Sequence, residues 1–438
     1  MRKALFITLM LTFPAGLTAH IGMPSVRTIR FVGDGPSQAW VVMENVGLLL
    51  EDGPGFRWLC DEAITPLPGL QDLAVTGGGG LRWTAATRNG VFVTEDNGCT
   101  FTPMAGVLAE HVIGRVDPHP QHPEEALVTT QTLGLPNDVF RTTDGGHTWL
   151  PANLDLPGRV RALIRSQQNP DVLYVTHAVG ALRSDDGGQT FSPIAVGPAE
   201  LAVSGIDFEL LGTRPGPMEE VFAAVIQFPN AHLVRTRDQG LTWETVQIFE
   251  DIPDSLVFSR DGSQGLVSFP FDGLYRSNDG GDTWTETATP EESPWISCLT
   301  RVPAADTIWA CARRGNAWLL ASSLDFGRSW TPRFGYAFRE IIGSWACEPS
   351  TQTGRVCADA CDRSLQNCSG ADAGLDGPPT DPVDMGRDLG GNVEDAHIIG
   401  PEARRRPTPS CSLIEGPDSL PFVLLLWGLS RRRRKNRI

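Results

Sequence analysis

Long apolar runs, helical periodicity and positive charge are all scarce in this 438-residue sequence. Two apolar stretches, at 4–13 and 420–429, have 10 residues each, whereas a membrane-spanning helix needs roughly 20. No segment beyond the N-terminal region has a convincing helical period. The formal net charge of -16 disfavours broad attraction to nucleic acid or to anionic membranes. We therefore expect an all-β protein that does not bind nucleic acid.

Familiar catalytic and metal-binding motifs are also missing. There is no Gly-x-Ser-x-Gly elbow, no His-Glu-x-x-His helix and no phosphate-binding loop. The segment 117–125 gathers Asp117, His119 and His122, but its prolines indicate an exposed loop and no second cluster completes a tetrahedral metal site. No metal and no cofactor are expected.

A short box, Ser/Thr-x-Asp-x-Gly-x-Thr/Ser-Trp/Phe, recurs along the chain. Six full copies lie at 94–101, 142–149, 184–191, 236–243, 277–284 and 323–330, and a weaker copy lies at 50–58. Successive box aspartates are 41 to 52 residues apart; they are Asp52, Asp96, Asp144, Asp186, Asp238, Asp279 and Asp325. This period is typical of propeller blades.

Each repeat unit contains four short apolar or alternating runs that end in turn signals, as strands do. One four-stranded antiparallel sheet cannot bury both of its faces, so neighbouring units must stack on it. Seven units arranged radially close into a ring. The sequence therefore predicts an all-β, seven-bladed β-propeller of four-stranded antiparallel blades with a disulfide-rich C-terminal extension; an open solenoid is the alternative.

The box is predicted to stabilise the turn between the third and fourth strands of each blade. Its aspartate can accept hydrogen bonds from backbone N–H groups, its glycine can adopt positive φ, and its hydroxyl residue can close the loop. The Trp or Phe that follows would pack between blades. Seven copies favour a structural role over catalysis.

These boxes resemble the Asp-box, or BNR, repeat, and their spacing through residues 26–346 is similar to that of YVTN/BNR-like propellers. That group includes sialidases, xyloglucan-cleaving hydrolases, sortilin-type receptors and a photosystem II assembly factor. The resemblance implies the fold but not one activity. Sialidase activity is not expected, because the family's Phe/Tyr-Arg-Ile-Pro motif is missing and only three tyrosines are present. Xyloglucan-cleaving relatives generally form their cleft from two propellers, and only one fits here.

Propellers usually bind ligands at the mouth of the central channel, through the turns between second and third strands. Here those turns combine charged, amide and aromatic groups: Glu44, Asn45, Arg88, Asn89, Gln131, His177, Gln227, Asn230, Phe271, Asp272, Arg313 and Arg314. Such a surface suits a protein or a glycan. Glu44 and Asp272 are the carboxylates that would act if the protein were a glycoside hydrolase. The alternative, favoured for any single position, is that the residue is merely a solvated turn residue.

The N-terminus is predicted to be an export signal, because a basic start ("MRK") precedes the apolar stretch 4–13 and small residues lead to a plausible cleavage site after Ala19. Export would make eight of the nine cysteines disulfide candidates. One pair lies on adjacent predicted strands, four cysteines cluster after the propeller, and two follow the first two boxes. The cluster suits two internal disulfides, with a zinc site as alternative, and the box pair suits an interblade bridge; connectivity stays open. In that order the candidates are Cys298 and Cys311; Cys347, Cys357, Cys361 and Cys368; Cys60 and Cys99.

Five regions are predicted along the chain. They are a signal peptide (1–19), the propeller (20–346), a Cys-rich extension (347–370), a disordered linker (371–410) and a C-terminal segment (411–438). Cys411, the apolar stretch and the terminal arginines resemble MYXO-CTERM sorting signals, which implies Cys411 as the anchoring point. The apolar stretch is shorter than the family pattern, so it could be cleaved or retained.

The sequence thus predicts an exported, monomeric, non-catalytic propeller that binds an extracellular or periplasmic protein or glycan at its channel mouth. Its C-terminal segment would anchor it at the surface or outer membrane, or in the periplasm, of a Gram-negative bacterium, with release as an alternative. A glycoside hydrolase using Glu44 and Asp272 is the alternative activity. A structural surface-layer role is a third hypothesis, favoured if residues after Gly335 plug the channel.

Overall fold

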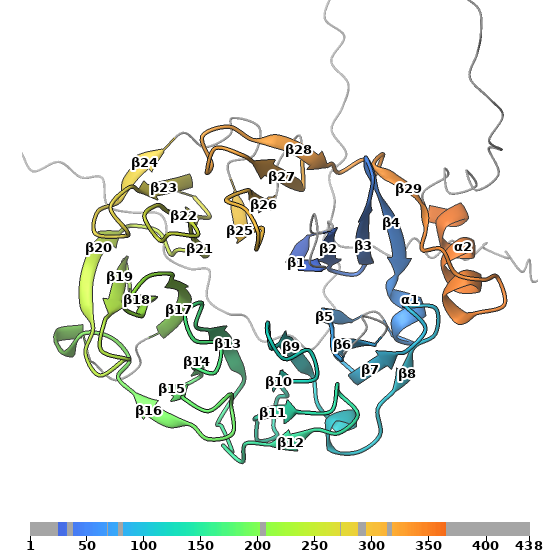
Figure 1. Ribbon diagram of the computed structural model, residues 1–438, viewed down its shortest axis with the longest axis horizontal. Coiled ribbons are helices and arrows are strands. Elements are labelled where there is room, and N and C mark those ends of the chain that lie inside the picture. Colours follow the sequence, from blue (N-terminus) through green and yellow to red (C-terminus); the bar gives the residue numbers. More distant parts are fainter. Residues whose placement is uncertain are drawn as a thin grey trace, which may run out of the picture. The chain divides into compact units, whose positions relative to one another are not determined.

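The computed structural model describes residues 25–32, 38–67, 69–77, 82–201, 207–271, 273–287, 295–312 and 318–364. Their strands form seven sheets that are arranged as a ring (Figure 1). Blade 7 meets blade 1 through edge-to-face ring pairs, with centroids 5.9 Å apart for Phe31 and Trp309 and 5.4 Å apart for Phe56 and Phe334. The predicted seven-bladed propeller is confirmed, and the open solenoid is excluded.

The blades follow one another along the chain, four antiparallel strands to each. Blade 1 contains β1 (Val26–Val32), β2 (Gln38–Met43), β3 (Gly47–Asp52) and β4 (Gly55–Cys60). Blade 2 contains β5 (Leu70–Val75), β6 (Trp83–Thr87), β7 (Gly90–Thr94) and β8 (Thr102–Pro103). Blade 3 contains β9 (Ile113–Pro118), β10 (Ala126–Thr130), β11 (Val139–Thr142) and β12 (Leu150–Pro151). Blade 4 contains β13 (Val160–Arg165), β14 (Leu173–His177), β15 (Gly180–Ser184) and β16 (Ser192–Ile194).

The remaining three blades have the same order of strands. Blade 5 contains β17 (Asp207–Arg214), β18 (Glu220–Gln227), β19 (Asn230–Thr236) and β20 (Glu244–Phe249). Blade 6 contains β21 (Ser255–Phe258), β22 (Gly265–Phe269), β23 (Gly273–Ser277) and β24 (Thr285–Thr287). Blade 7 contains β25 (Ile296–Arg301), β26 (Ile308–Ala312), β27 (Leu320–Ser323) and β28 (Thr331–Phe334). Short 3₁₀ turns at Val107–Glu110 and Ala199–Leu201 lie between blades.

The first strand of each blade is the innermost one (Figure 1). Because the blades repeat one topology, their turns between second and third strands meet on one face of the ring, together with the connections between blades. We call this the upper face. The box turns between third and fourth strands lie at the opposite ends of the third strands, on the lower face. The fold thus separates the repeated boxes from the predicted binding turns.

The box turns are held by a repeated set of hydrogen bonds. In blade 3, Asp144 Oδ1 accepts from the backbone N–H groups of His147 and Thr148 at 3.0 and 2.9 Å. Asp144 also accepts from the hydroxyls of Thr142 and Thr148, at 2.7 and 2.6 Å. Gly146 adopts φ of 85° and donates its N–H to the Thr142 hydroxyl at 2.9 Å. The aspartate therefore stabilises its own turn.

The box tryptophans fill the space between neighbouring blades. Trp149 packs in a core shared by blades 2 and 3, Trp243 in one shared by blades 4 and 5, and Trp284 in one shared by blades 5 and 6. The weaker copy differs, since Asp52 forms an ion pair with Arg57 at 2.6 Å. Each full box thus links a local turn to the contact between blades.

Replacing Asp279 with Ala is expected to lower the free energy of unfolding by about 1–2 kcal/mol at neutral pH, because three hydrogen bonds at 2.6 to 2.9 Å are lost. Slight burial works to raise the pKa of Asp279, but hydrogen bonds from Thr283 and Ser277 outweigh it and lower the pKa to about 2. This contribution is therefore present above the ordinary value of 3.8 and is lost as pH falls towards 2. Urea unfolding from pH 7 to pH 2.5 should show the difference between wild type and variant shrinking; a constant difference would contradict the assignment.

The chain after blade 7 returns to the outer edge of blade 1. Here β29 (Ile341–Ser344) pairs in parallel with β4 and makes this sheet five-stranded. The helix α2 (Gln352–Ser364) then packs against β4 and against the short helix α1 (Asp61–Ile64). These described residues after Gly335 lie at the rim (Figure 1) and do not plug the channel. A surface-layer role is favoured only if residues after Gly335 plug the channel, and the described residues of this segment do not.

Three disulfides are present in the described residues. Cys298–Cys311 joins β25 to β26, as their predicted strand positions indicated, with Cα atoms 4.9 Å apart. Cys60–Cys357 and Cys99–Cys347 join the C-terminal extension to blades 1 and 2, each with Cα atoms 5.4 Å apart. These bonds tie the rim extension to the ring.

Two of the expected cysteine pairings are therefore wrong. Cys347 and Cys357 do not pair within their own cluster, and Cys60 does not bridge to Cys99. The reason is that the chain folds back along β4, which places each extension cysteine beside a blade cysteine. The side chain of Cys361, and all of Cys368, lie outside the described residues.

The helix α2 is an element that the sequence pattern does not predict. It has 13 residues, and Cys357 attaches it to the end of β4. A short helix anchored in this way does not depend on a broad apolar stripe. None of the helices in the described ranges combines the length and hydrophobicity needed to cross a membrane.

Candidate functional site

The inner strands of blades 1 to 4 each have a β-bulge near their start. In β1 and β2, Val26 pairs with Met43 and Thr28 with Val42, which leaves Arg27 as the extra residue. The same irregularity in β5, β9 and β13 leaves Gln71, Gly114 and Arg161 as extra residues. Bulges commonly re-aim side chains next to functional sites.

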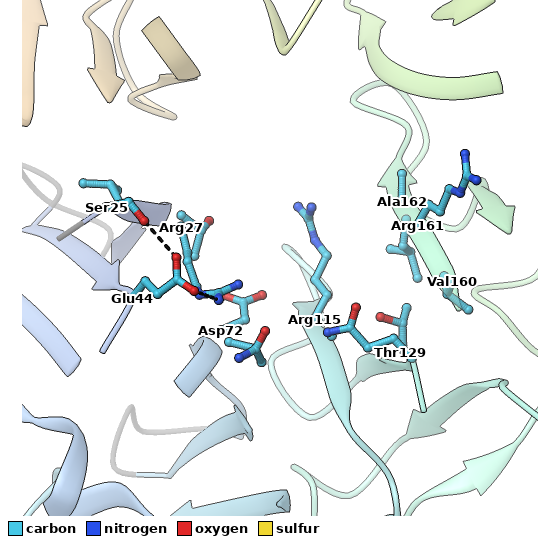
Figure 2. A pocket seen from close by; sticks show the side chains of 15 residues that line it. Ser25, Arg27, Glu44, Asp72, Arg115, Thr129, Val160, Arg161 and Ala162 are labelled. Carbon is cyan, nitrogen blue, oxygen red and sulfur yellow. Dashed lines mark hydrogen bonds and ion pairs between the residues drawn. The ribbon is translucent and has the colours of Figure 1, made fainter. Parts of the chain in front are cut away.

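A cavity of about 530 Å³ lies among these bulged strands, at the upper end of blades 1 to 4. Figure 2 shows its polar lining, with Glu44 and Asp72 on one side, Arg161 on the other and Arg115 between them. The other polar side chains of the wall include Ser25, Arg27, Thr28, Gln71, Thr129 and Gln131. We call this the channel pocket.

Glu44 is held in the channel pocket by three side chains. Arg27 Nη2 donates to its carboxylate at 2.7 Å, the Ser25 hydroxyl donates at 3.0 Å, and Arg88 Nη2 lies 3.7 Å away. Partial burial works to raise the pKa of Glu44, but Arg27, Ser25 and Arg88 outweigh it, so the pKa lies below its ordinary value. Glu44 is therefore an ionised, paired carboxylate at neutral pH.

Asp72 links the inner strands of three blades. It is only 3% exposed, and it accepts from Arg30 Nε of blade 1 at 2.9 Å and from the backbone N–H of Val116 in blade 3 at 3.0 Å. It also accepts from the N–H of Leu73 at 2.9 Å. Asp72 therefore stabilises the wall of the channel pocket and is not free to act on a ligand.

Arg115 and Arg161 are the two arginines of the far wall of the pocket. Both residues are exposed. Arg161 forms an ion pair with Asp207 at the start of blade 5. No hydrogen bond or ion pair joins the Arg115 guanidinium to another residue within the described ranges, and Figure 2 shows it extending into the cavity. A guanidinium in this position can bind a carboxylate with two parallel hydrogen bonds.

The predicted site residues divide into three groups. Glu44 and Arg88 come together at the pocket, and Gln131 lines it. Asn45 is exposed at its turn, Phe271 is exposed on blade 6, and His177 is half-buried at the end of β14, outside the pocket wall. Asp272, Arg313 and Arg314 lie outside the described residues.

Asn89 has a structural contact instead of a free amide. Its Nδ2 donates to the Thr65 hydroxyl at 3.2 Å, and to the Leu67 carbonyl at 3.4 Å.

His119 stabilises a loop, because its Nδ1 accepts hydrogen bonds from the backbone N–H groups of Gln121 and His122 at 3.2 and 3.1 Å. Burial lowers the pKa of His119, with the positive charge of Arg165 adding to the effect. Its neutral ring therefore supports the 117–125 turn.

Sequence reasoning missed Arg27, Arg115 and Arg161, which lie on inner strands and not on turns. Each is the first arginine of a strand-like run, as in "VRTIR", "IGRVD" and "VRALIR". A polar residue in an otherwise apolar innermost strand was the available signal. The bulges at Arg27 and Arg161, which turn these two side chains inward, have no recognisable local sequence pattern.

Comparison with known proteins supports the fold. No protein-family model matches the sequence, and no curated protein matches it. An ancestral GH74 enzyme has a TM-score of 0.54 at 15% identity, covering 70% of this chain and 46% of that one. The GH74 xyloglucanase from Xanthomonas campestris has a TM-score of 0.51 at 15% identity, covering 72% and 54%.

A third similar structure is an extracellular domain, from a protein of B. thetaiotaomicron described as a hybrid two-component system. Its TM-score is 0.50 at 12% identity, covering 68% of this chain and 39% of that one. The chain spans about half the length, or less, of these three structures. At these identities the similarity establishes a β-propeller and no particular activity.

Proposed function

We propose that this protein is an exported, non-catalytic binding propeller that holds an anionic group of a protein or glycan in the channel pocket. The observation that supports this most directly is Arg115, whose exposed guanidinium extends into the cavity. Arg161 and Arg27 lie beside it, paired with Asp207 and Glu44, while amide and hydroxyl groups line the rest of the wall. This combination suits a carboxylate within a larger polar ligand.

The hydrolase alternative is not favoured by the carboxylates of the channel pocket. Glycoside hydrolysis needs one carboxyl group that stays protonated as the general acid. Glu44 has a lowered pKa and is paired with Arg27. Asp72 is buried against Arg30. Neither described carboxylate is therefore suited to the acid role.

Export is supported by the three disulfides, since such bonds are typical of oxidising compartments. We further propose that the C-terminal segment anchors the protein to the surface of a Gram-negative cell through Cys411. In this location the upper face would meet extracellular or periplasmic partners.

Replacing Arg115 with Gln should weaken anion binding about ten-fold or more, because a charge-assisted hydrogen bond contributes about 1.5–3 kcal/mol. Polyglutamate and polygalacturonate serve as carboxylate probes of protein and glycan type, and calorimetric titration at low salt measures their affinity. Native protein should bind at least one probe, and that binding should weaken as salt is raised.

The matched control is Arg328→Gln on the lower face, where Arg328 is exposed and bonds to a backbone carbonyl. Its affinity should equal that of the native protein. If native protein binds neither polymer, or if both variants lose affinity equally, the channel pocket is not the anion site.

A further inference from the structure

Four neighbouring blades present a large apolar side chain at the same place on the upper face. Each lies in the turn between the second and third strands, on blades 3, 4, 5 and 6 in order. The side chains and their exposed fractions are Leu133 (91%), Val179 (73%), Phe228 (93%) and Phe271 (71%). We call this set the apolar crescent.

The turns of the apolar crescent are held firmly in place. Asn137 is fully buried and fixes the Leu133 turn, accepting from the Thr132 N–H at 2.7 Å and donating to the Thr132 carbonyl at 3.0 Å. Phe271 donates its N–H to Asp251 at 2.6 Å, and its ring packs edge-on against Trp295 with centroids 5.0 Å apart.

Val179 and Phe228 are fixed by the shortest possible turns. Two-residue turns join β14 to β15 and β18 to β19, where His177 pairs with Gly180 and Gln227 with Asn230. The exposed side chains are therefore displayed by rigid backbone, which limits the entropy lost when a partner covers them.

A scattered exposed apolar residue is ordinary in a soluble protein, but this arrangement is regular. The equivalent turns of blades 1 and 2 present polar residues, among them Glu44 and Arg88. On the lower face, four large apolar side chains of the described residues are also exposed, but they occupy different positions in the turns, and their blades 3, 5 and 7 are not neighbours. They are Leu150, Met218, Leu241 and Leu324. The regularity of the crescent marks an interaction surface.

We propose that the apolar crescent docks an extended segment of a partner polypeptide, whose apolar side chains cover the crescent while a carboxylate of the same segment enters the channel pocket. This inference rests on the proposed function, since it assigns the ligand of that pocket to one class. Arg115 and Arg161 lie on the inner strands of blades 3 and 4, the blades that carry Leu133 and Val179. Charge and apolar surface therefore meet on the same two blades.

The chemistry of the crescent favours a polypeptide over a glycan. Sugar rings are bound through aromatic faces together with polar groups, whereas Leu133 and Val179 are aliphatic and match apolar side chains. A lipid surface is disfavoured as well, because the exposed Glu250 and Asp254 in the connection from β20 to β21 would repel anionic head groups.

A random 12-residue peptide library displayed on phage tests the proposal, with the full chain as bait. Enriched peptides should carry at least one acidic residue and at least two large apolar residues. The double variant Leu133→Ser/Phe228→Ser should bind the enriched peptides at least about ten-fold more weakly, yet bind the carboxylate polymer of the previous test as native protein does. Arg115→Gln should weaken both.

The matched control is Leu241→Ser/Leu324→Ser on the lower face, which should bind like the native protein. If the crescent variant keeps full peptide affinity, or if selection enriches peptides without apolar residues or none at all, the inference fails while the proposed anion site can still stand. Loss of phosphatidylcholine/phosphatidylglycerol vesicle binding in the crescent variant, without loss of peptide binding, would instead assign the surface to a membrane. A crescent variant that weakens polygalacturonate as much as peptide would assign it to a glycan.

Discussion

Replacing Trp83 with Ala is expected to lower the free energy of unfolding by about 3–5 kcal/mol, a large part of the stability of most domains. Trp83 lies in β6 and is fully buried. Its ring is 4.5 Å from that of Trp40 in blade 1 and 6.0 Å from that of Trp345, which directly follows β29. Its removal leaves a cavity where three parts of the chain meet.

The residues around Trp83 cannot easily move in to fill the cavity that its removal leaves. A Cβ atom built on Gly98 in the box turn of blade 2 would lie 2.4 Å from the Trp83 ring, so the turn already rests against the indole. Urea unfolding measures the loss. Trp83→Phe should cost less than Trp83→Ala, because much of the volume is kept.

Trp330→Ala is the matched control, since Trp330 is a partly exposed tryptophan that stacks on Trp318 with centroids 6.3 Å apart. It should cost clearly less than Trp83→Ala. Equal decreases in the free energy of unfolding at the two positions would show that the buried position of Trp83 between blades 1 and 2 contributes no extra stability.

The count of blades and the structure of their turns were predictable because both are local. A box such as Thr142 to Trp149 contains the donors, acceptors and glycines of its own turn, so one short segment is enough to specify it. Repetition of that segment then gave the number of blades. The pairing of Cys298 with Cys311 was accessible for the same reason, since adjacent strands of one blade hold both.

The parts that were not predicted depend on contacts between distant segments. Cys60 and Cys357 are separated by 297 residues, and nothing near either cysteine indicates that the chain returns to β4. The channel pocket depends on bulges, where one extra residue reverses the side of the strand on which Arg27 or Arg161 lies. The regular alternation of side chains between the two sides of a strand therefore could not predict that these arginines face the channel.

The two faces of the ring differ in how their exposed groups are paired. On the lower face, aspartates such as Asp279 are saturated by hydrogen bonds from their own turns. On the upper face, Arg115 and the tips Leu133 and Phe228 are exposed to solvent although the backbone around them is well held. The aspartates that stabilise the box turns are thus paired, whereas Arg115 and the turn tips that we propose as contacts for a partner are exposed.

Removal of both disulfides that hold the C-terminal extension is expected to lower the free energy of unfolding by about 5 kcal/mol or more, because each closes a very long loop of the unfolded chain. The separations are 297 residues for Cys60–Cys357 and 248 for Cys99–Cys347. The variant changes all four cysteines to Ser. Either disulfide alone should contribute less, since the remaining one still closes most of the same loop.

Two measurements distinguish detachment of the extension from a loss of stability of the whole protein. Thermal unfolding measures stability, and limited proteolysis measures attachment of residues 336–364, whose remaining contacts include the Trp345 Nε1 bond to the Asn97 carbonyl at 2.7 Å. The control Cys298→Ser/Cys311→Ser removes a disulfide with a separation of only 13 residues, so it should cost about 3 kcal/mol or less and leave the extension protected. Because β29 and α2 are held at the rim of blade 1, the four-cysteine variant should expose them to protease before the ring unfolds. Cleavage there that is no faster than in the native protein, at an unchanged melting temperature, would show that packing against β4 alone holds the extension.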